Sequence, residues 1–361
     1  MRGKNSVFLI VVLVVGLFAL IAMVQTEKQK PAGRKGERKP EPPITGPPKD
    51  GKPVGDRQRQ IAFVSDRHGN SEIFVVNADG SKLKRLTTNE AEDSSPTMSP
   101  DGKKIAFTSD RDGNSEIYVV NTNGTGLTRL TNSSGNELWP KWSPNGKQIA
   151  FWSRDDNQSD IFVMDADGSN SANLTQDNQE DLYPNWMPKG DLIVYLSLRD
   201  GGYQFYSIST DGSGLKKLDS GLPPSKHDPS QIMGIFIDAD VSSRQIQFFT
   251  KKEGIVPFED PGLALGEFPA WSPDSTKIAF HSNRDGNMEI YVVNEDRSHL
   301  NRLTANNAHD MFPCWSPDGK KIAFQSNRDG NLDIYVMNAD GSKPIRLTRH
   351  AAKDSQPAWC P

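Results

Sequence analysis

The sequence predicts an all-β fold of the β-propeller class, in which four-stranded antiparallel sheets surround a central axis. The first observation is repetition: a motif resembling "IAF" recurs, mostly at intervals of 44 residues, starting at Ile61, Ile105, Ile149, Ile193, Ile246, Ile278 and Ile322. The second is that each repeat contains apolar runs of strand length, such as Lys104–Ser109 and Glu116–Asn121. The third is a regular series of "DG" and "NG" pairs, which predict tight hairpin turns.

Each repeat is predicted to form four strands, from the segments "PxWSP", "KIAFxS", "EIYVVN" and "LxRLT", with the first one innermost. The fifth repeat, Gln231–Glu267, lacks the "DRDGN" turn of the others, although the intervals around it nearly restore two periods. We therefore expect seven blades with a degenerate fifth, and six blades is the alternative. The chain ends on a lone first-strand segment, Gln356–Pro361, which is expected to complete the first blade and protect its edge.

The amino-terminal segment predicts a membrane anchor followed by a linker. Val7–Val24 contains 18 uncharged, mostly apolar residues, which is long enough to span a bilayer. We expect a transmembrane signal anchor within residues 1–25, with a cleaved signal peptide as the alternative. Residues 26–57 contain seven prolines and many charges, which predicts a disordered linker before a propeller at residues 58–361.

Charge is distributed unevenly along the chain. Residues 1–57 carry 11 lysines and arginines against 5 acids, whereas the rest of the chain carries 31 against 41. Binding to nucleic acid requires a basic face that can neutralise phosphates. The acidic body therefore argues against a nucleic-acid partner.

The repeat resembles a known family. The segment "WSPDGKKIAFQSNRDGNLDIYVMNADG", Trp315–Gly341, is similar to the repeat of TolB-type β-propellers, and the resemblance extends from Gln60 to Pro361. It implies a propeller that lies outside the cytoplasm, in the periplasm or the extracellular space. The lysines and arginines of the linker favour the opposite orientation, because basic segments tend to stay on the cytoplasmic side.

Catalytic motifs are scarce. The sequence has no Gly-x-Ser-x-Gly elbow, and Cys314 and Cys360 are out of register for a disulfide. His227, His309 and His350 fall in the loops between successive repeats. They are weak candidates for a metal centre like that of propeller-type lyases, and exposed loop histidines are the alternative. We expect no catalytic residues and no cofactor, with a divalent cation as the alternative.

The strongest candidate site is a set of acids that precede the first strand of successive repeats. They are expected to surround one mouth of the axial tunnel, and they are Asp93, Glu137, Asp181, Asp228, Asp310 and Asp354. Such a ring would attract a cation or a basic peptide. Aromatic residues just before the first-strand proline are expected to contact such a peptide, and they are Trp139, Tyr183, Phe268 and Phe312. The alternatives are that each acid caps its own turn and that each aromatic residue packs between blades.

Together these features predict a membrane-tethered, extracytoplasmic β-propeller that acts as a protein-binding scaffold. The expected partner is a protein or peptide of the cell envelope. Because the repeats build a rigid ring, their loops are free to vary and to present a recognition surface. The alternative function is an enzyme acting on carbohydrate or peptide, either a metal-dependent lyase or a hydrolase.

Overall fold

The computed structural model describes residues 60–155, 158–187, 190–199, 202–217, 232–237, 246–250, 254–257, 270–274, 276–283, 285–294 and 298–359. They lie within Pro47–Pro361, the larger of two units into which the chain divides. The described elements are antiparallel strands, and none of these residues belongs to a helix long and apolar enough to cross a membrane. The predicted anchor (residues 1–25) and linker (residues 26–57) lie outside the described residues.

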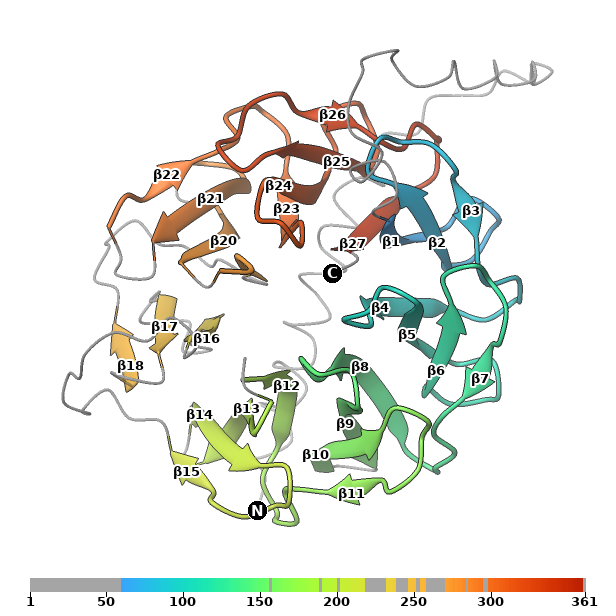
Figure 1. The fold of residues 1–361 in the computed structure, drawn as a ribbon, viewed down its shortest axis with the longest axis vertical. Coiled ribbons are helices and arrows are strands. Elements are labelled where there is room, and N and C mark those ends of the chain that lie inside the picture. The colour runs from blue at the N-terminus through green and yellow to red at the C-terminus, as the bar shows by residue number, and fades with distance from the viewer. Residues whose placement is uncertain are drawn as a thin grey trace, which may run out of the picture. The chain divides into compact units, whose positions relative to one another are not determined.

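The strands form a ring of sheets within this unit, and the first predicted strand of each repeat lies nearest the axis (Figure 1). Blade 1 consists of β27 (Asp354–Trp359), β1 (Gln60–Ser65), β2 (Glu72–Asn77) and β3 (Lys84–Arg85). Blade 2 consists of β4 (Asp93–Met98), β5 (Lys104–Ser109), β6 (Glu116–Asn121) and β7 (Thr128–Arg129). Blade 3 consists of β8 (Asn136–Trp142), β9 (Gln148–Asp155), β10 (Gln158–Asp165) and β11 (Ala172–Asn173).

The second half of the chain continues this pattern with one exception. Blade 4 consists of β12 (Asp181–Trp186), β13 (Leu192–Arg199), β14 (Gly202–Ser209) and β15 (Lys216–Lys217). Blade 5 consists of β19 (Ala270–Trp271), β20 (Lys277–Ser282), β21 (Glu289–Asn294) and β22 (Asn301–Arg302). Blade 6 consists of β23 (Asp310–Trp315), β24 (Lys321–Ser326), β25 (Asp333–Asn338) and β26 (Ile345–Arg346).

The exception lies between blades 4 and 5 in the sequence, where a sheet has three strands: β16 (Ile232–Ile237), β17 (Ile246–Thr250) and β18 (Gly254–Pro257). This is the repeat that lacks the "DRDGN" turn. The described residues therefore form six four-stranded blades, and a seventh four-stranded blade is not among them.

The last strand closes the ring, as the sequence predicts. β27 pairs with β1 in an antiparallel ladder that aligns Ile61 with Trp359 and Ser65 with Asp354. Blade 1 is thus assembled from both ends of the propeller, and β1 has a hydrogen-bonded neighbour on each side. The pairing removes an exposed strand edge, which would otherwise invite aggregation.

Apolar contacts between neighbouring blades form the core. Phe107 and Tyr118 of blade 2 pack in one cluster with Val64 and Ile73 of blade 1. The repeated tryptophans also connect blades: the Nε1 of Trp315 donates a hydrogen bond to the backbone oxygen of Ala270 in the preceding blade, at 2.9 Å. Trp315 thus packs between blades 5 and 6.

A glycine in the turn after the third strand of blades 1, 2, 3, 4 and 6 tests how closely the blades approach. Gly341 has φ +82°, and a Cβ atom there would lie 2.7 Å from the backbone oxygen of Leu303 in the preceding blade. Gly212 has nearly the same φ, +80°, and its Cβ would meet no atom within 4 Å. We expect Gly212→Ala to lower the unfolding free energy by about 1 kcal/mol through backbone strain, and Gly341→Ala by about 2–4 kcal/mol through strain plus overlap.

Denaturant unfolding of both variants measures this difference. Gly212→Ala is the matched control, because it changes the backbone in the same way without the overlap. Equal losses in the two variants would contradict the close blade contact at Gly341.

Candidate functional site

The described members of the predicted acid set lie at the start of the innermost strands, but their side chains are buried in the protein. Asp93, Asp181, Asp310 and Asp354 have no exposed surface, and Glu137 is 3% exposed. Asp228 lies outside the described residues. The structure thus does not present the five described acids as an open rim of charge.

Three of these acids are paired with an arginine from the turn between the second and third strands of the same blade. In blade 2, the guanidinium of Arg111 donates to both carboxylate oxygens of Asp93, at 2.9 and 3.0 Å. The same guanidinium lies 4.6 Å from the ring centroid of Tyr118 and 5.6 Å from that of Phe107. Arg67 likewise donates to both oxygens of Asp354, at 2.9 Å, whereas Arg328 donates to one oxygen of Asp310, at 2.7 Å. The acids therefore anchor their own blades through side chains, and the predicted backbone cap is not the contact formed.

A second acid accompanies each of them 21 residues earlier, on the third strand of the preceding blade. For Asp93 this second acid is Glu72. Glu72 accepts a hydrogen bond from Arg85 of β3 at 2.6 Å. Glu289 with Arg302 and Asp333 with Arg346 form the same ion pair in blades 5 and 6. Each of these joints between blades thus holds two buried carboxylates and two arginines.

Blade 3 departs from this pattern. Asp155 stands two residues after Ser153, where blade 2 has Arg111 two residues after Ser109. Asn173 aligns with Phe162, where blade 2 aligns Arg129 with Tyr118. Blade 3 has therefore lost both arginines and kept the acids Glu137 and Asp160.

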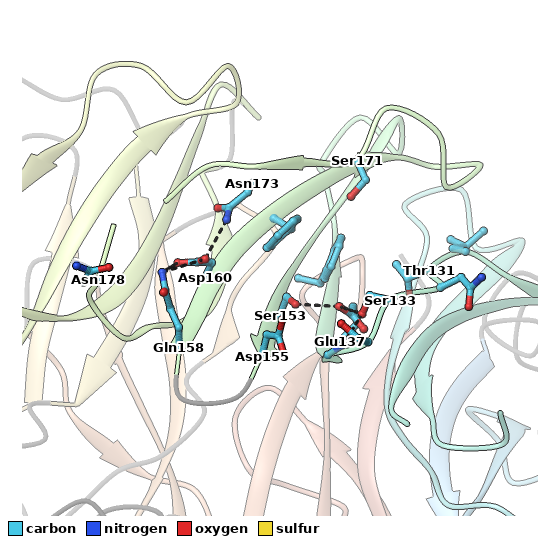
Figure 2. Close-up of a pocket in the computed structure, with 16 residues that line it drawn as sticks. Thr131, Ser133, Glu137, Ser153, Asp155, Gln158, Asp160, Ser171, Asn173 and Asn178 are labelled. Atoms are coloured by element: carbon cyan, nitrogen blue, oxygen red, sulfur yellow. Dashed lines mark hydrogen bonds between the residues drawn. The ribbon is translucent and has the colours of Figure 1, made fainter. Parts of the chain in front are cut away.

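A cavity of about 850 Å³ lies where the first arginine would be. Phe151 and Glu137 line it, and exposed residues such as Asp155 and Asn178 also contribute to its wall. In Figure 2, Glu137 and Ser153 lie on one side, whereas Asp160 contacts Gln158 and Asn173 on the other.

The cavity is negatively charged. Its described lining includes three acids, Glu137, Asp155 and Asp160, and no lysine or arginine. Burial raises the pKa of the Glu137 carboxyl, and the neighbouring charge of Glu116 raises it further. Burial also raises the pKa of Asp160. A raised pKa means that ionising the acid inside the protein costs free energy, and a bound cation would offset that cost.

Comparison with known proteins identifies the family of this ring. A family model described as the TolB beta propeller domain matches residues 53–139, 128–221 and 242–361. The chain belongs to the TolB β-propeller family. A relative, the Tol-Pal system protein TolB of Geobacter sulfurreducens, is 42% identical over 45 residues, which make up 12% of this chain and 10% of the relative. That match thus spans a tenth of the relative's length.

Solved structures share the propeller fold. TolB from Acinetobacter baumannii has a TM-score of 0.59 at 20% identity, over 85% of this chain and 68% of that chain. The β-propeller domain of the Trilobed protease from Pyrococcus furiosus has a TM-score of 0.59 at 12% identity, over 82% and 96% of the two chains. An oligogalacturonate lyase in complex with manganese has a TM-score of 0.57 at 15% identity, over 81% and 86%. At these identities the similarity shows the fold alone.

The candidate aromatic residues of this TolB-family propeller contact neighbouring blades. The rings of Trp139 in blade 3 and Tyr183 in blade 4 meet edge to face, with centroids 6.0 Å apart. Phe312 of blade 6 lies 5.6 Å from the ring of His281 in blade 5. These contacts support the packing alternative for the three residues, whereas Phe268 lies outside the described part of the chain. Peptide binding by them stays a prediction.

The two described candidate histidines accept backbone hydrogen bonds, His309 from the neighbouring blade and His350 within its own turn. The Nδ1 of His309 accepts a hydrogen bond from the backbone of Met288, and that of His350 accepts one from Ala352. Among the described residues, three or more metal-ligating side chains do not gather at one point. His227 lies outside the described residues, as does Cys360.

Of the residues around the blade 3 cavity, sequence reasoning selected only Glu137. The signal that could have found the others is a comparison of repeats position by position. The phrase "SDRDGNSE" of blade 2 becomes "SRDDNQSD" in blade 3, which places Asp155 where an arginine is expected. The two strands of this hairpin also extend further, to Asp155 and from Gln158, so no "DRDGN" turn folds an arginine back over the aromatic pair.

Proposed function

We propose that the protein is a membrane-tethered, extracytoplasmic β-propeller that binds another protein of the cell envelope and acts as a scaffold. Membership of the TolB family supports this role, because TolB-type propellers mediate protein interactions in the cell envelope. The name of the Geobacter sulfurreducens relative places that protein in the Tol-Pal system. The match to that protein covers only 45 residues. We therefore infer the partner of this chain from the surface of the chain itself.

The observation that carries the proposal is the acidic cavity of blade 3. Its volume, about 850 Å³, falls within the range of sites that hold a ligand or an inserted side chain. Asp93, Asp310 and Asp354 are instead paired with arginines of the chain itself. Of the predicted acids, Glu137 is therefore the member that we assign to partner binding.

The amino-terminal segment supports the tether. Val7–Val24 is apolar and long enough to span a bilayer, and residues 26–57 are rich in proline and charge. In this proposal the segment 1–25 anchors the protein and the linker holds the ring away from the membrane. We also propose that the sheet β16–β18 is a reduced blade that stands between blades 4 and 5, which would make seven blades in all.

Two measurements test this function. A reporter that is active only after export, fused after Pro361, is expected to be active, and a reporter active only in the cytoplasm is expected to be silent. The full-length protein, cross-linked in envelopes of its host and purified, is expected to retain a stoichiometric protein partner. Activity of the cytoplasmic reporter would contradict the location, and purification without any protein partner would contradict the scaffold role.

A further inference from the structure

Charge balance distinguishes the joint between blades 2 and 3 from the three joints at which two arginines are described. Between blades 1 and 2, Glu72 and Asp93 face Arg85 and Arg111. The joints between blades 5 and 6 and between blades 6 and 1 also pair two acids with two arginines. Between blades 2 and 3, Glu116 and Glu137 face Arg129 alone among the described side chains. This joint therefore lacks one positive charge.

One oxygen of Glu137 also lacks a partner. Its Oε1 accepts hydrogen bonds from Ser133 at 2.7 Å and from Ser153 at 2.8 Å. Its Oε2 is buried and has no hydrogen-bond donor among the described residues. In the sister blade, both oxygens of Asp93 accept bonds from Arg111. Glu72, Glu289 and Asp310 each have such an oxygen too, although an arginine pairs with each of them. Glu137 differs from Asp93, Asp310 and Asp354 because no described arginine pairs with its carboxylate.

The aromatic support for the missing arginine is nevertheless in place. The rings of Phe151 and Phe162 stack with centroids 5.5 Å apart at 24°. The pair that carries Arg111, Phe107 and Tyr118, has centroids 5.9 Å apart at 29°. The two phenylalanines line the cavity, so the surface on which a guanidinium stacks in blade 2 faces an open space in blade 3. Arg154 is the residue before Asp155 in the chain, and it is not among the described residues that line the cavity.

We propose that this cavity binds the guanidinium group of an arginine side chain from a protein partner, stacked on Phe151 and Phe162 and bonded to Glu137. The inference rests on the proposed protein-binding function and names the chemistry that the partner presents. A guanidinium fits because it is planar, stacks on aromatic rings and donates to a carboxylate through two parallel hydrogen bonds. A lysine ammonium fits less well, because it is a strongly hydrated point charge. In effect, the partner supplies the arginine that the other blades carry themselves.

A direct titration tests the assignment. The full chain in detergent is titrated with the blocked tripeptide Gly-Arg-Gly, and binding is followed by ligand-observed NMR. The same peptide with citrulline, which keeps the shape and loses the charge, is expected to bind about tenfold or more weakly. The peptide with lysine is expected to bind less tightly than the arginine peptide. Equal binding of the arginine and citrulline peptides, or binding of neither, would overturn the proposal.

Two variants locate the site. Asp155→Arg restores the chain's own arginine and is expected to abolish binding of the arginine peptide without lowering the melting temperature. Glu137→Gln is expected to weaken binding about tenfold or more. Asp167→Asn is the matched control, because Asp167 is an exposed acid of the same blade that does not line the cavity. Its affinity is expected to stay unchanged.

The remaining outcomes are also decisive. Undiminished binding to Asp155→Arg would place the peptide elsewhere and would refute the site. If manganese chloride alone raised the melting temperature of the wild type and not of Glu137→Gln, and the arginine peptide had no effect, the acids would belong to a metal site. If the arginine peptide failed while a protein partner was still captured from envelopes, only this assignment would fall and the scaffold role would stand.

Discussion

Removal of residues 354–361 is expected to unfold the whole propeller. These residues contain β27, which supplies the inner strand of blade 1 and the ladder that joins the two ends of the ring. The deletion also removes Trp359, which is 7% exposed and packs with Ile61, and it leaves Arg67 without Asp354. Loss of a large core side chain costs about 3–5 kcal/mol, and breaking a buried ion pair costs a similar amount. Their sum approaches the whole stability of an ordinary domain, about 5–15 kcal/mol.

Circular dichroism during heating and size-exclusion chromatography measure this effect. The truncated chain is expected to show no cooperative melting transition and to elute as aggregates, because β1 then presents an unpaired edge. A chain that stops after Trp359 is the matched control, since it loses Cys360 and Pro361 and keeps β27 entire. If the longer deletion melted at the wild-type temperature and stayed monomeric, closure by β27 would not hold the ring together.

Much of the fold could be predicted from the sequence because its signals are local and repeated. Strand length, turn glycines and the 44-residue interval all lie within one repeat, and the terminal segment Gln356–Pro361 indicated the closing strand. The sheet β16–β18 was harder to predict, because its repeat lacks the turn that marks the second hairpin elsewhere.

The candidate site was predicted in part, for a different physical reason. The position of the acids follows from their constant distance to the first-strand proline, but exposure depends on partners elsewhere in the fold. Asp93 meets Arg111 18 residues later, and Asp354 meets Arg67 across 287 residues. The local sequence pattern places an acid next to a loop, but it does not indicate which distant arginine pairs with the acid and buries it.

The ion pair between Arg111 and Asp93 is expected to be a main determinant of stability. Asp93 is fully buried and lies at the joint with Glu72, so removing the guanidinium leaves two buried carboxylates with Arg85 as their described counter-charge. We expect Arg111→Met to lower the unfolding free energy at neutral pH by about 3–5 kcal/mol, the usual cost of breaking a buried pair. Methionine can keep apolar contact with Tyr118 and Phe107, so most of the loss in unfolding free energy measures the removal of the positive charge.

Two comparisons separate charge from packing. Adding Asp93→Asn to Arg111→Met is expected to recover part of the loss, because no buried charge then remains unpaired at that position. Asp155→Met in blade 3 is the matched control, since it changes the equivalent position of a blade that has no such arginine. We expect its effect to be within about 0.5 kcal/mol, as for other exposed positions.

The pH dependence of Arg111→Met follows from the state of Asp93. In the wild type, burial already raises the pKa of this carboxyl above its usual value, against the opposing effects of Ser109, Thr87 and Arg111. Loss of Arg111 raises the folded-state pKa further, and a group whose pKa is raised on folding loses stability as the pH rises through that pKa. The deficit of Arg111→Met relative to the wild type should therefore be largest at neutral pH and shrink as the pH falls toward 5. A deficit that stayed constant over this range, or grew on acidification, would mean that Asp93 is not an uncompensated buried charge in the variant, and that Arg111 stabilises blade 2 by packing on its aromatic pair.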